Sequence, residues 1–120
     1  MLSETDGALT KTPQNVFVLR GQDAILNCAT NSTPPNGRNP IEWKYDGNII
    51  SQSPCTVQSP GFVASPPDSA TYCNLRAEAS NEDGISGAYL CQDFSARSPT
   101  AQAVATVIVL GKLHQLFSSR

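Results

Sequence analysis

Four cysteines and one histidine are the side chains of this chain best suited to covalent or metal-binding chemistry. They are Cys28, Cys55, Cys73, Cys91 and His114, and the gaps between successive cysteines are 27, 18 and 18 residues. Structural zinc sites are normally built from closely spaced cysteine pairs, which these gaps do not provide. A Ser-His or Cys-His pair needs a base near its nucleophile, whereas the single histidine lies in a polar tail. The sequence therefore predicts no metal, no cofactor and no enzyme activity.

The cysteines are better suited to disulfide bonds. An even number of cysteines in a small domain favours a disulfide framework formed in an oxidising compartment. Four cysteines allow three pairings, and their number does not choose among them. Tyr89 and Cys91 are two residues apart, so in an extended strand their side chains point to the same face. A cysteine and a tyrosine on one face indicate a buried disulfide core.

Length and charge limit the class of protein. The chain has 120 residues, 15% of them charged, and a net charge of −2, which fits one domain with a small core. It has no cluster of Lys or Arg, so neither nucleic acid nor an anionic membrane is an expected partner. Its longest nearly apolar run, 103–110, is too short to insert across a bilayer. The first ten residues lack the features of a signal peptide, and we interpret Met1 as an added start after removal of any native signal.

Short segments rich in β-branched residues, separated by turn signals, predict an all-β fold. Residues 16–28 are expected to form two strands hinged at Gly21, with Ala24, Leu26 and Cys28 on one face. Further strands are expected within 71–79, 88–94 and 101–110.

The segment 41–51 alternates most clearly. We expect Ile41, Trp43 and Tyr45 to point inward, and Glu42, Lys44 and Asp46 to point outward, before a turn at Asp46-Gly47. The segment 29–40 is dense in Pro, Asn and Gly and is expected to hold no regular element. The segment 51–73 is rich in proline, so any strand there should be short and at a sheet edge.

The order and spacing of Cys28, Trp43, Tyr89 and Cys91 resemble those of an immunoglobulin-superfamily domain, over about residues 10–111. In this family a tryptophan on strand C packs on a disulfide between strands B and F, and a tyrosine precedes the second cysteine by two residues. The resemblance implies an all-β, immunoglobulin-like, two-sheet Greek-key β-sandwich with a B–F intersheet disulfide. The resemblance implies an I-set-like domain, with V-set as the alternative. Residues 1–9 would then be a disordered N-terminus, and 112–120 a tail or interdomain linker.

The resemblance also implies which residues build the interior. It pairs Cys28 with Cys91 and leaves Cys55 and Cys73 for a second bridge, with an intermolecular bond or two free thiols as the alternatives. The implied core residues are Trp43, Tyr89 and Leu26. One departure concerns Ile85, which stands where most I-set and V-set members carry an aspartate. The basic partner of that aspartate is also missing, because no Lys or Arg occurs from residue 45 to residue 75.

The function implied by the resemblance is extracellular protein recognition, in a cell-surface receptor or adhesion protein or in a secreted protein. Immune-type binding is one form of this recognition. The binding would be homophilic, to another copy of the same protein, or heterophilic, to a different protein. The expected surface is the outer side of the GFC sheet, with five candidate interface residues: Glu42, Lys44, Leu90, Gln92 and Phe94. The alternatives are a structural spacer in a multidomain ectodomain, and binding of a small glycan or peptide at the loop tip. Asn31 begins an Asn-Ser-Thr sequon, so an N-glycan is expected there.

Overall fold

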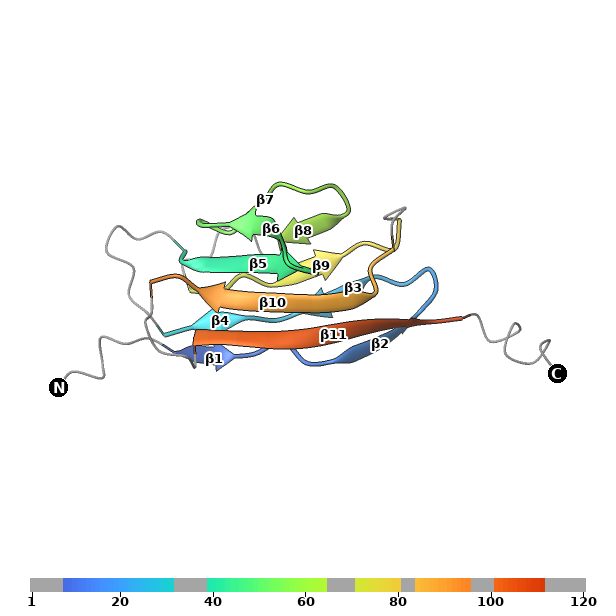
Figure 1. Ribbon diagram of the computed structural model, residues 1–120, viewed down its shortest axis with the longest axis horizontal. Helices are drawn as coiled ribbons and strands as arrows, with labels where there is room; N and C mark the ends of the chain where they lie inside the picture. Colours follow the sequence, from blue (N-terminus) through green and yellow to red (C-terminus); the bar gives the residue numbers. More distant parts are fainter. Residues whose placement is uncertain (1–7, 32–38, 65–70, 81–83, 96–100, 112–120) are drawn as a thin grey trace.

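The computed structural model describes residues 8–31, 39–64, 71–80, 84–95 and 101–111 of the chain. These residues form two layers of β-strands packed face to face (Figure 1). The described strands are β1 (Leu9–Lys11), β2 (Val16–Leu19), β3 (Ala24–Leu26), β4 (Ala29–Thr30), β5 (Ile41–Tyr45), β6 (Asn48–Gln52), β7 (Thr56–Val57), β8 (Phe62–Ala64), β9 (Leu75–Ala77), β10 (Gly87–Asp93) and β11 (Gln102–Leu110). Among the described residues, there is no helix long and apolar enough to span a membrane.

One layer is a six-stranded sheet in the order β2-β11-β10-β5-β6-β7. Its pairs are antiparallel except for β2, which runs parallel to β11. The immunoglobulin labels of these strands are A′, G, F, C, C′ and C″. Because β6 and β7 extend the sheet beyond β5, this layer has the arrangement of a variable-type domain.

The other layer contains β3, β9 and β8, with a short β1–β4 pair beside them. An isolated bridge between Ala29 and Tyr72 continues the β3–β9 pairing past Cys28. The segment expected to hold no regular element therefore begins with a strand. β4 forms because Thr30 and Ala29 pair with β1, which also brings Leu9 into the sandwich, ahead of the expected boundary at residue 10. The rest of that segment, 32–38, lies outside the described residues.

The core lies between the layers and contains the expected residues. Trp43 and Tyr89 are fully buried, and Leu26 is nearly so. The hydroxyl of Tyr89 donates to the carbonyl oxygen of Ile85 at 2.7 Å, which is the tyrosine-corner contact of this fold. Ile85 is itself buried in the core cluster, so an apolar contact occupies the position where the family usually has an aspartate.

Two disulfides cross-link the layers. The first joins Cys28 to Cys91, with Cα atoms 6.5 Å apart, and confirms the intersheet bond. The second joins Cys55 to Cys73, with Cα atoms 5.7 Å apart, and no cysteine is free. Cys55 lies in the turn between β6 and β7, so this bond holds the edge of the six-stranded sheet to the segment before β9. The strands of the proline-rich segment, β7 and β8, are short and lie at sheet edges, as expected.

Candidate recognition surface

The outer face of the six-stranded sheet is defined by the side chains that alternate with the buried ones. Tyr89 and Cys91 on β10 point into the core, so Leu90 and Gln92 point outward. Residues paired directly across neighbouring strands share a face of the sheet. The register of the strands therefore maps the outer face row by row. In Figure 1, β10 and β11 pass in front of β3 and β4, so the view is onto this face.

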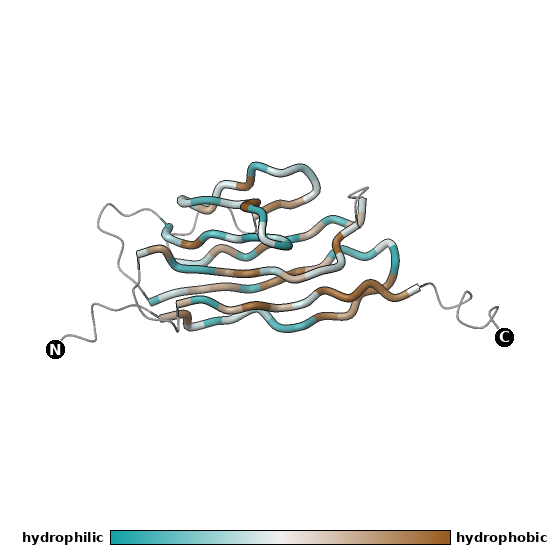
Figure 2. The backbone as a smooth tube through the Cα atoms, viewed as in Figure 1, coloured by the Kyte–Doolittle hydropathy of each residue, from teal (hydrophilic) through white to brown (hydrophobic). Residues whose placement is uncertain are grey.

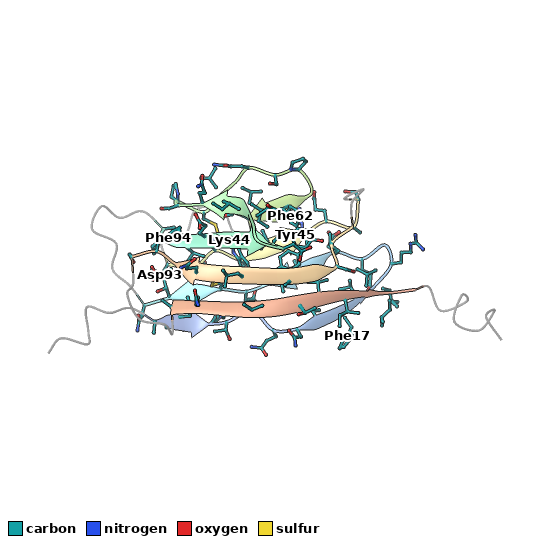
Figure 3. The ribbon with its side chains drawn as sticks, in the orientation of Figure 1. Phe17, Lys44, Tyr45, Phe62, Asp93 and Phe94 are labelled. Atoms are coloured by element: carbon teal, nitrogen blue, oxygen red, sulfur yellow. A yellow bond between two sulfur atoms is a disulfide. The ribbon has the colours of Figure 1, made fainter. Side chains whose placement is uncertain are left out.

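A mainly apolar row crosses four strands of this face. Val104 on β11 pairs with Leu90 on β10, Leu90 pairs with Lys44 on β5, and Lys44 pairs with Ile49 on β6. Val104 is 62% exposed and Ile49 is 45% exposed, whereas Leu90 and Lys44 are half-buried. We call these four residues the apolar row. Lys44, labelled in Figure 3, places one cation within it.

A polar row lies beside the apolar row, toward the end of the sheet at which β10 ends. It consists of Gln102, Gln92 and Glu42, which pair across β11, β10 and β5. The expected candidates Leu90, Lys44, Gln92 and Glu42 therefore occupy two adjacent rows of one face.

Glu42 differs from its expected role as an exposed, charged residue. Its side chain points outward by alternation, yet it is only 3% exposed, and its Oε1 atom has no hydrogen-bond partner. Burial raises the pKa of the Glu42 carboxyl, and the nearby charge of Lys44 opposes that rise. Alternation correctly predicted the face of the sheet on which the Glu42 side chain lies. The exposure of that side chain, however, depends on which neighbouring parts of the chain cover it. The outer face thus contains a buried carboxylate with an unsatisfied oxygen.

Phe94 lies apart from the apolar row. It follows the last residue of β10, is 56% exposed, and its backbone N–H donates to the carbonyl oxygen of Pro40 at 3.0 Å. Figure 3 shows it beside Asp93 at the end of β10, beyond Lys44. Phe94 is therefore an exposed aromatic residue at the loop end of the sheet.

A second apolar area was not singled out from the sequence. Phe17 on β2 pairs with Ile108 on β11, and Leu19 pairs with Leu110. All four are exposed, Phe17 by 62%, and we call them the A′G strip. Figure 2 shows these apolar residues together where β2 runs along the C-terminal half of β11. The signal available in the sequence was alternation along residues 16–19, which places Phe17 and Leu19 on the face opposite Val18.

Asp93 was also missed as a structural residue. It is 1% exposed and accepts a hydrogen bond from the Thr30 hydroxyl. Its other carboxylate oxygen accepts from the backbone N–H and the hydroxyl of Ser95, at 2.8 and 2.7 Å. Two-residue spacing from the buried Cys91 was the signal that could have placed it inward. This carboxylate joins the ends of β4 and β10 near the loop tip.

Asn31 is exposed at the end of β4. Its Oδ1 atom accepts a hydrogen bond from the backbone N–H of Ala8 at 2.9 Å. An N-glycan is attached through the side-chain nitrogen, so this contact is compatible with glycosylation. The other two residues of the sequon lie outside the described residues.

Two hollows lined by described residues offer little chemistry. A cavity of about 450 Å³ lies at the end where β11 leaves the domain, and Arg20 and Ser86 are the polar or charged residues that line it. A shallower hollow beside β7 and β8 is lined by residues 54–60 and 62–64, none of them charged. Among the described residues, no group of His, Cys, Asp and Glu could hold a metal ion.

The chain is similar to solved structures of immunoglobulin domains. It matches a chimeric titin Z1Z2-Z1Z2 tandem at 26% identity with a TM-score of 0.66, over 88% of this chain and 50% of that one. It matches the N-terminal Ig1-2 module of the Drosophila receptor protein tyrosine phosphatase DLAR at 22% identity and a TM-score of 0.67, over 90% of this chain and 50% of that one. A third match is Dpr1 IG1 bound to DIP-eta IG1, at 17% identity and a TM-score of 0.67, over 88% and 97% of the two chains.

The chain spans about half the length of the titin and DLAR chains that it matches. No protein-family model and no curated protein matches it. The two-sheet sandwich, the intersheet disulfide and these structural matches make the chain an immunoglobulin-superfamily domain. The matched structures include a module of a receptor protein tyrosine phosphatase, one immunoglobulin domain bound to another, and domains of titin.

Proposed function

We propose that this domain is an extracellular protein-recognition module of a cell-surface receptor or adhesion protein, and that it binds through the outer face of its six-stranded sheet. The observation that carries the proposal is the apolar row, in which Val104 and Ile49 expose large aliphatic side chains on either side of Leu90 and Lys44. Contiguous exposed apolar residues bordered by polar ones are typical of interaction sites.

The physical basis of binding is burial of this apolar surface. Removing apolar area from water stabilises a complex by about 25 cal/mol per Å², and a few central residues normally contribute most of the affinity. Lys44 sets the orientation of a partner, because a charge inside an apolar contact disfavours any arrangement that leaves it unpaired. The A′G strip extends the same face toward β2.

Two further observations support this proposal. Two disulfides favour an oxidising compartment, which fits a cell surface or a secreted protein. The Dpr1 match is a complex between two immunoglobulin domains, so this fold is used for protein partners. An N-glycan at Asn31 is part of the proposal and would stand at the end of β4, in the layer opposite the outer face.

A structural spacer is the second candidate, because the titin match is a tandem of domains. A spacer would use the ends of the domain and leave the sheet face free. The loop-tip alternative depends mainly on residues 32–38 and 96–100, which lie outside the described residues.

Glycan wedges test the proposal directly. Gln102→Asn with Val104→Thr creates a sequon on the outer face, and Ile25→Asn with Asn27→Thr creates one on the exposed side of β3 as the matched control. Tetramers of each form, secreted from mammalian cells, are applied to cells and to a panel of receptor ectodomains. We expect the outer-face glycan to abolish binding and the β3 glycan to leave it intact. Equal binding by both forms contradicts the proposal, and no binding by unmodified tetramers favours the spacer.

A further inference from the structure

β2 is the outermost strand of the six-stranded sheet, and among the described strands it pairs with β11 alone. Figure 1 shows it beside β11 at the margin of the sheet. Its residues, Val16–Leu19, are all apolar, and an uncharged, proline-free edge strand is a template for pairing with another chain. The strand at the opposite edge, β7, has only two residues, which gives a second chain little to pair with. β2 is therefore the edge of this sheet that most favours strand addition.

The direction of the backbone groups decides which of them lie on the open side of β2. The N–H of Arg20 donates to the carbonyl oxygen of Leu110, at the end of β11, at 2.9 Å. Backbone groups alternate in direction along a strand, so those of Arg20 and Val18 point toward β11. The N–H and C=O groups of Phe17 and Leu19 consequently point to the open side, where a second strand would bond to them.

Gln22 occupies both open-side groups of Leu19. Its Oε1 atom accepts a hydrogen bond from the Leu19 N–H at 2.8 Å, and its own backbone N–H donates to the Leu19 carbonyl oxygen at 2.9 Å. The second bond closes a turn in which Gly21 has a φ of +96°, a conformation that favours glycine. This turn brings the Gln22 side chain back to the strand that it follows. Within the described part of the chain, only the open-side groups of Phe17 are left without a partner on this edge.

We propose that Gln22 closes the edge of β2 against strand addition, and that a second copy of this chain pairs there once the side-chain bond is removed. An antiparallel pair of β2 strands centred on Val18 lets Phe17 of each copy exchange hydrogen bonds with Leu19 of the other. It also sets the exposed Phe17 and Leu19 side chains against each other. Every hydrogen bond of that register involves Leu19, so one glutamine prevents all of them. Closure of the edge does not depend on the recognition function proposed above.

Removing the acceptor atom of Gln22 tests the proposal. Gln22→Met keeps the length of the side chain without its acceptor, and Gln14→Met places the same side chain at another exposed glutamine as the matched control. In sedimentation velocity of the oxidised domain over a wide concentration range, Gln22→Met should self-associate about tenfold more tightly than wild type. Gln14→Met should match wild type. Amide hydrogen exchange, followed by NMR at low protein concentration, should be faster at Leu19 in Gln22→Met than in wild type.

A second pair of variants identifies the edge as the contact. Phe17→Pro removes an N–H that an added strand would bond, whereas Phe17→Ala removes only the side chain. Proline is tolerated on an edge strand where the missing N–H would face solvent. Combined with Gln22→Met, Phe17→Pro should return self-association to the wild-type level. Phe17→Ala in the same combination should leave it above that level, because the backbone groups remain.

Each result decides the proposal. Faster exchange at Leu19 with tighter self-association that Phe17→Pro reverses supports closure of the edge by Gln22. Unchanged self-association of folded Gln22→Met overturns it, and so does exchange at Leu19 equal to that of wild type. Self-association that Phe17→Pro does not reverse also overturns it, since the second copy then docks elsewhere. If circular dichroism shows that Gln22→Met is unfolded, Gln22→Ala replaces it with the same expected results.

Discussion

The indole Nε1–H of Trp43 donates a hydrogen bond to the backbone carbonyl oxygen of Cys73 at 2.7 Å. Trp43 also lies directly opposite Cys91 on the neighbouring strand. One side chain therefore contacts the segments that carry both disulfides, the intersheet bond and the bond that holds the edge of the six-stranded sheet. Its burial and its hydrogen bond make it the central residue of the core.

Trp43→Phe should be strongly destabilising. The change leaves a cavity and removes the donor to a buried carbonyl oxygen, which together should lower the free energy of unfolding by about 3 kcal/mol. Urea unfolding followed by circular dichroism measures this, because the substitution removes the only tryptophan. Phe17→Leu, a change at an exposed residue, serves as the control and should cost under about 0.5 kcal/mol. A loss below about 1 kcal/mol for Trp43→Phe would show that this contact contributes little.

The Cys55–Cys73 disulfide should stabilise the domain without being required for its fold. For a closed loop of this length, with a sequence separation of 18 residues, loop-closure entropy gives about 3 kcal/mol. Replacing both cysteines by serine should lower the unfolding free energy by that amount and keep the far-ultraviolet spectrum of a β-sandwich. A double variant that unfolds completely would mean that the edge strands β6 and β7 depend on the bond.

Glu42→Gln should increase stability at neutral pH. Burial raises the pKa of the Glu42 carboxyl above its usual value of 4.5, so the folded state binds the proton more tightly than the unfolded state does. Stability is consequently lost as the pH rises from the unfolded pKa through the folded one. The variant avoids this loss and should be more stable than wild type at pH 7.

The pH dependence distinguishes this cause from a simple packing effect. At pH 3.5, one unit below the usual pKa of 4.5, the carboxyl is mostly neutral in both states, so wild type and Glu42→Gln should have nearly equal unfolding free energies. The measurement is urea unfolding at several pH values. A stability difference that is the same at pH 3.5 and pH 7 would show that ionisation of Glu42 is not responsible.

Phe94→Glu should leave the domain folded. Phe94 is exposed beyond the end of β10, so the change in unfolding free energy should be within about 0.5 kcal/mol. Because Phe94 lies apart from the apolar row, partner binding should fall less than it does for Val104→Glu. The tetramer assay compares the two variants at equal protein concentration. A larger loss of binding for Phe94→Glu would move the recognition surface toward the loop end.

Alternation along single strands was the most informative feature of the sequence. It predicted that Ile41 and Trp43 are buried and that Leu90 and Gln92 share the opposite face, because both strands lie between neighbours on either side. The bond between layers, from Cys28 to Cys91, was implied by the resemblance to an immunoglobulin-superfamily domain. These features depend on local periodicity and on the few residues that pack around a disulfide.

Other features depend on contacts that no local pattern contains. β4 exists because β1 pairs with it, and the composition around Thr30 gives no sign of that pairing. Glu42 has the alternation of an exposed residue but is covered in the folded chain. Asp93 is a charged residue at the end of a strand, where the sequence gives no sign of burial. It is nevertheless buried, because the hydroxyls of Thr30 and Ser95 donate hydrogen bonds to its carboxylate. In each case the deciding neighbour is distant in sequence or lies outside the alternating pattern.

Binding by a matched pair of charged substitutions tests the central claim, recognition through the outer face, most directly. Val104 and Ile25 are both β-branched and exposed, 62% and 51%, but they lie on opposite layers of the sandwich. Tetramers of Val104→Glu and Ile25→Glu, each shown to be folded, are compared with wild type on partner-bearing cells. We expect Val104→Glu to lose at least tenfold in apparent affinity and Ile25→Glu to bind like wild type. The reverse order would place the recognition surface on the other layer and contradict the account.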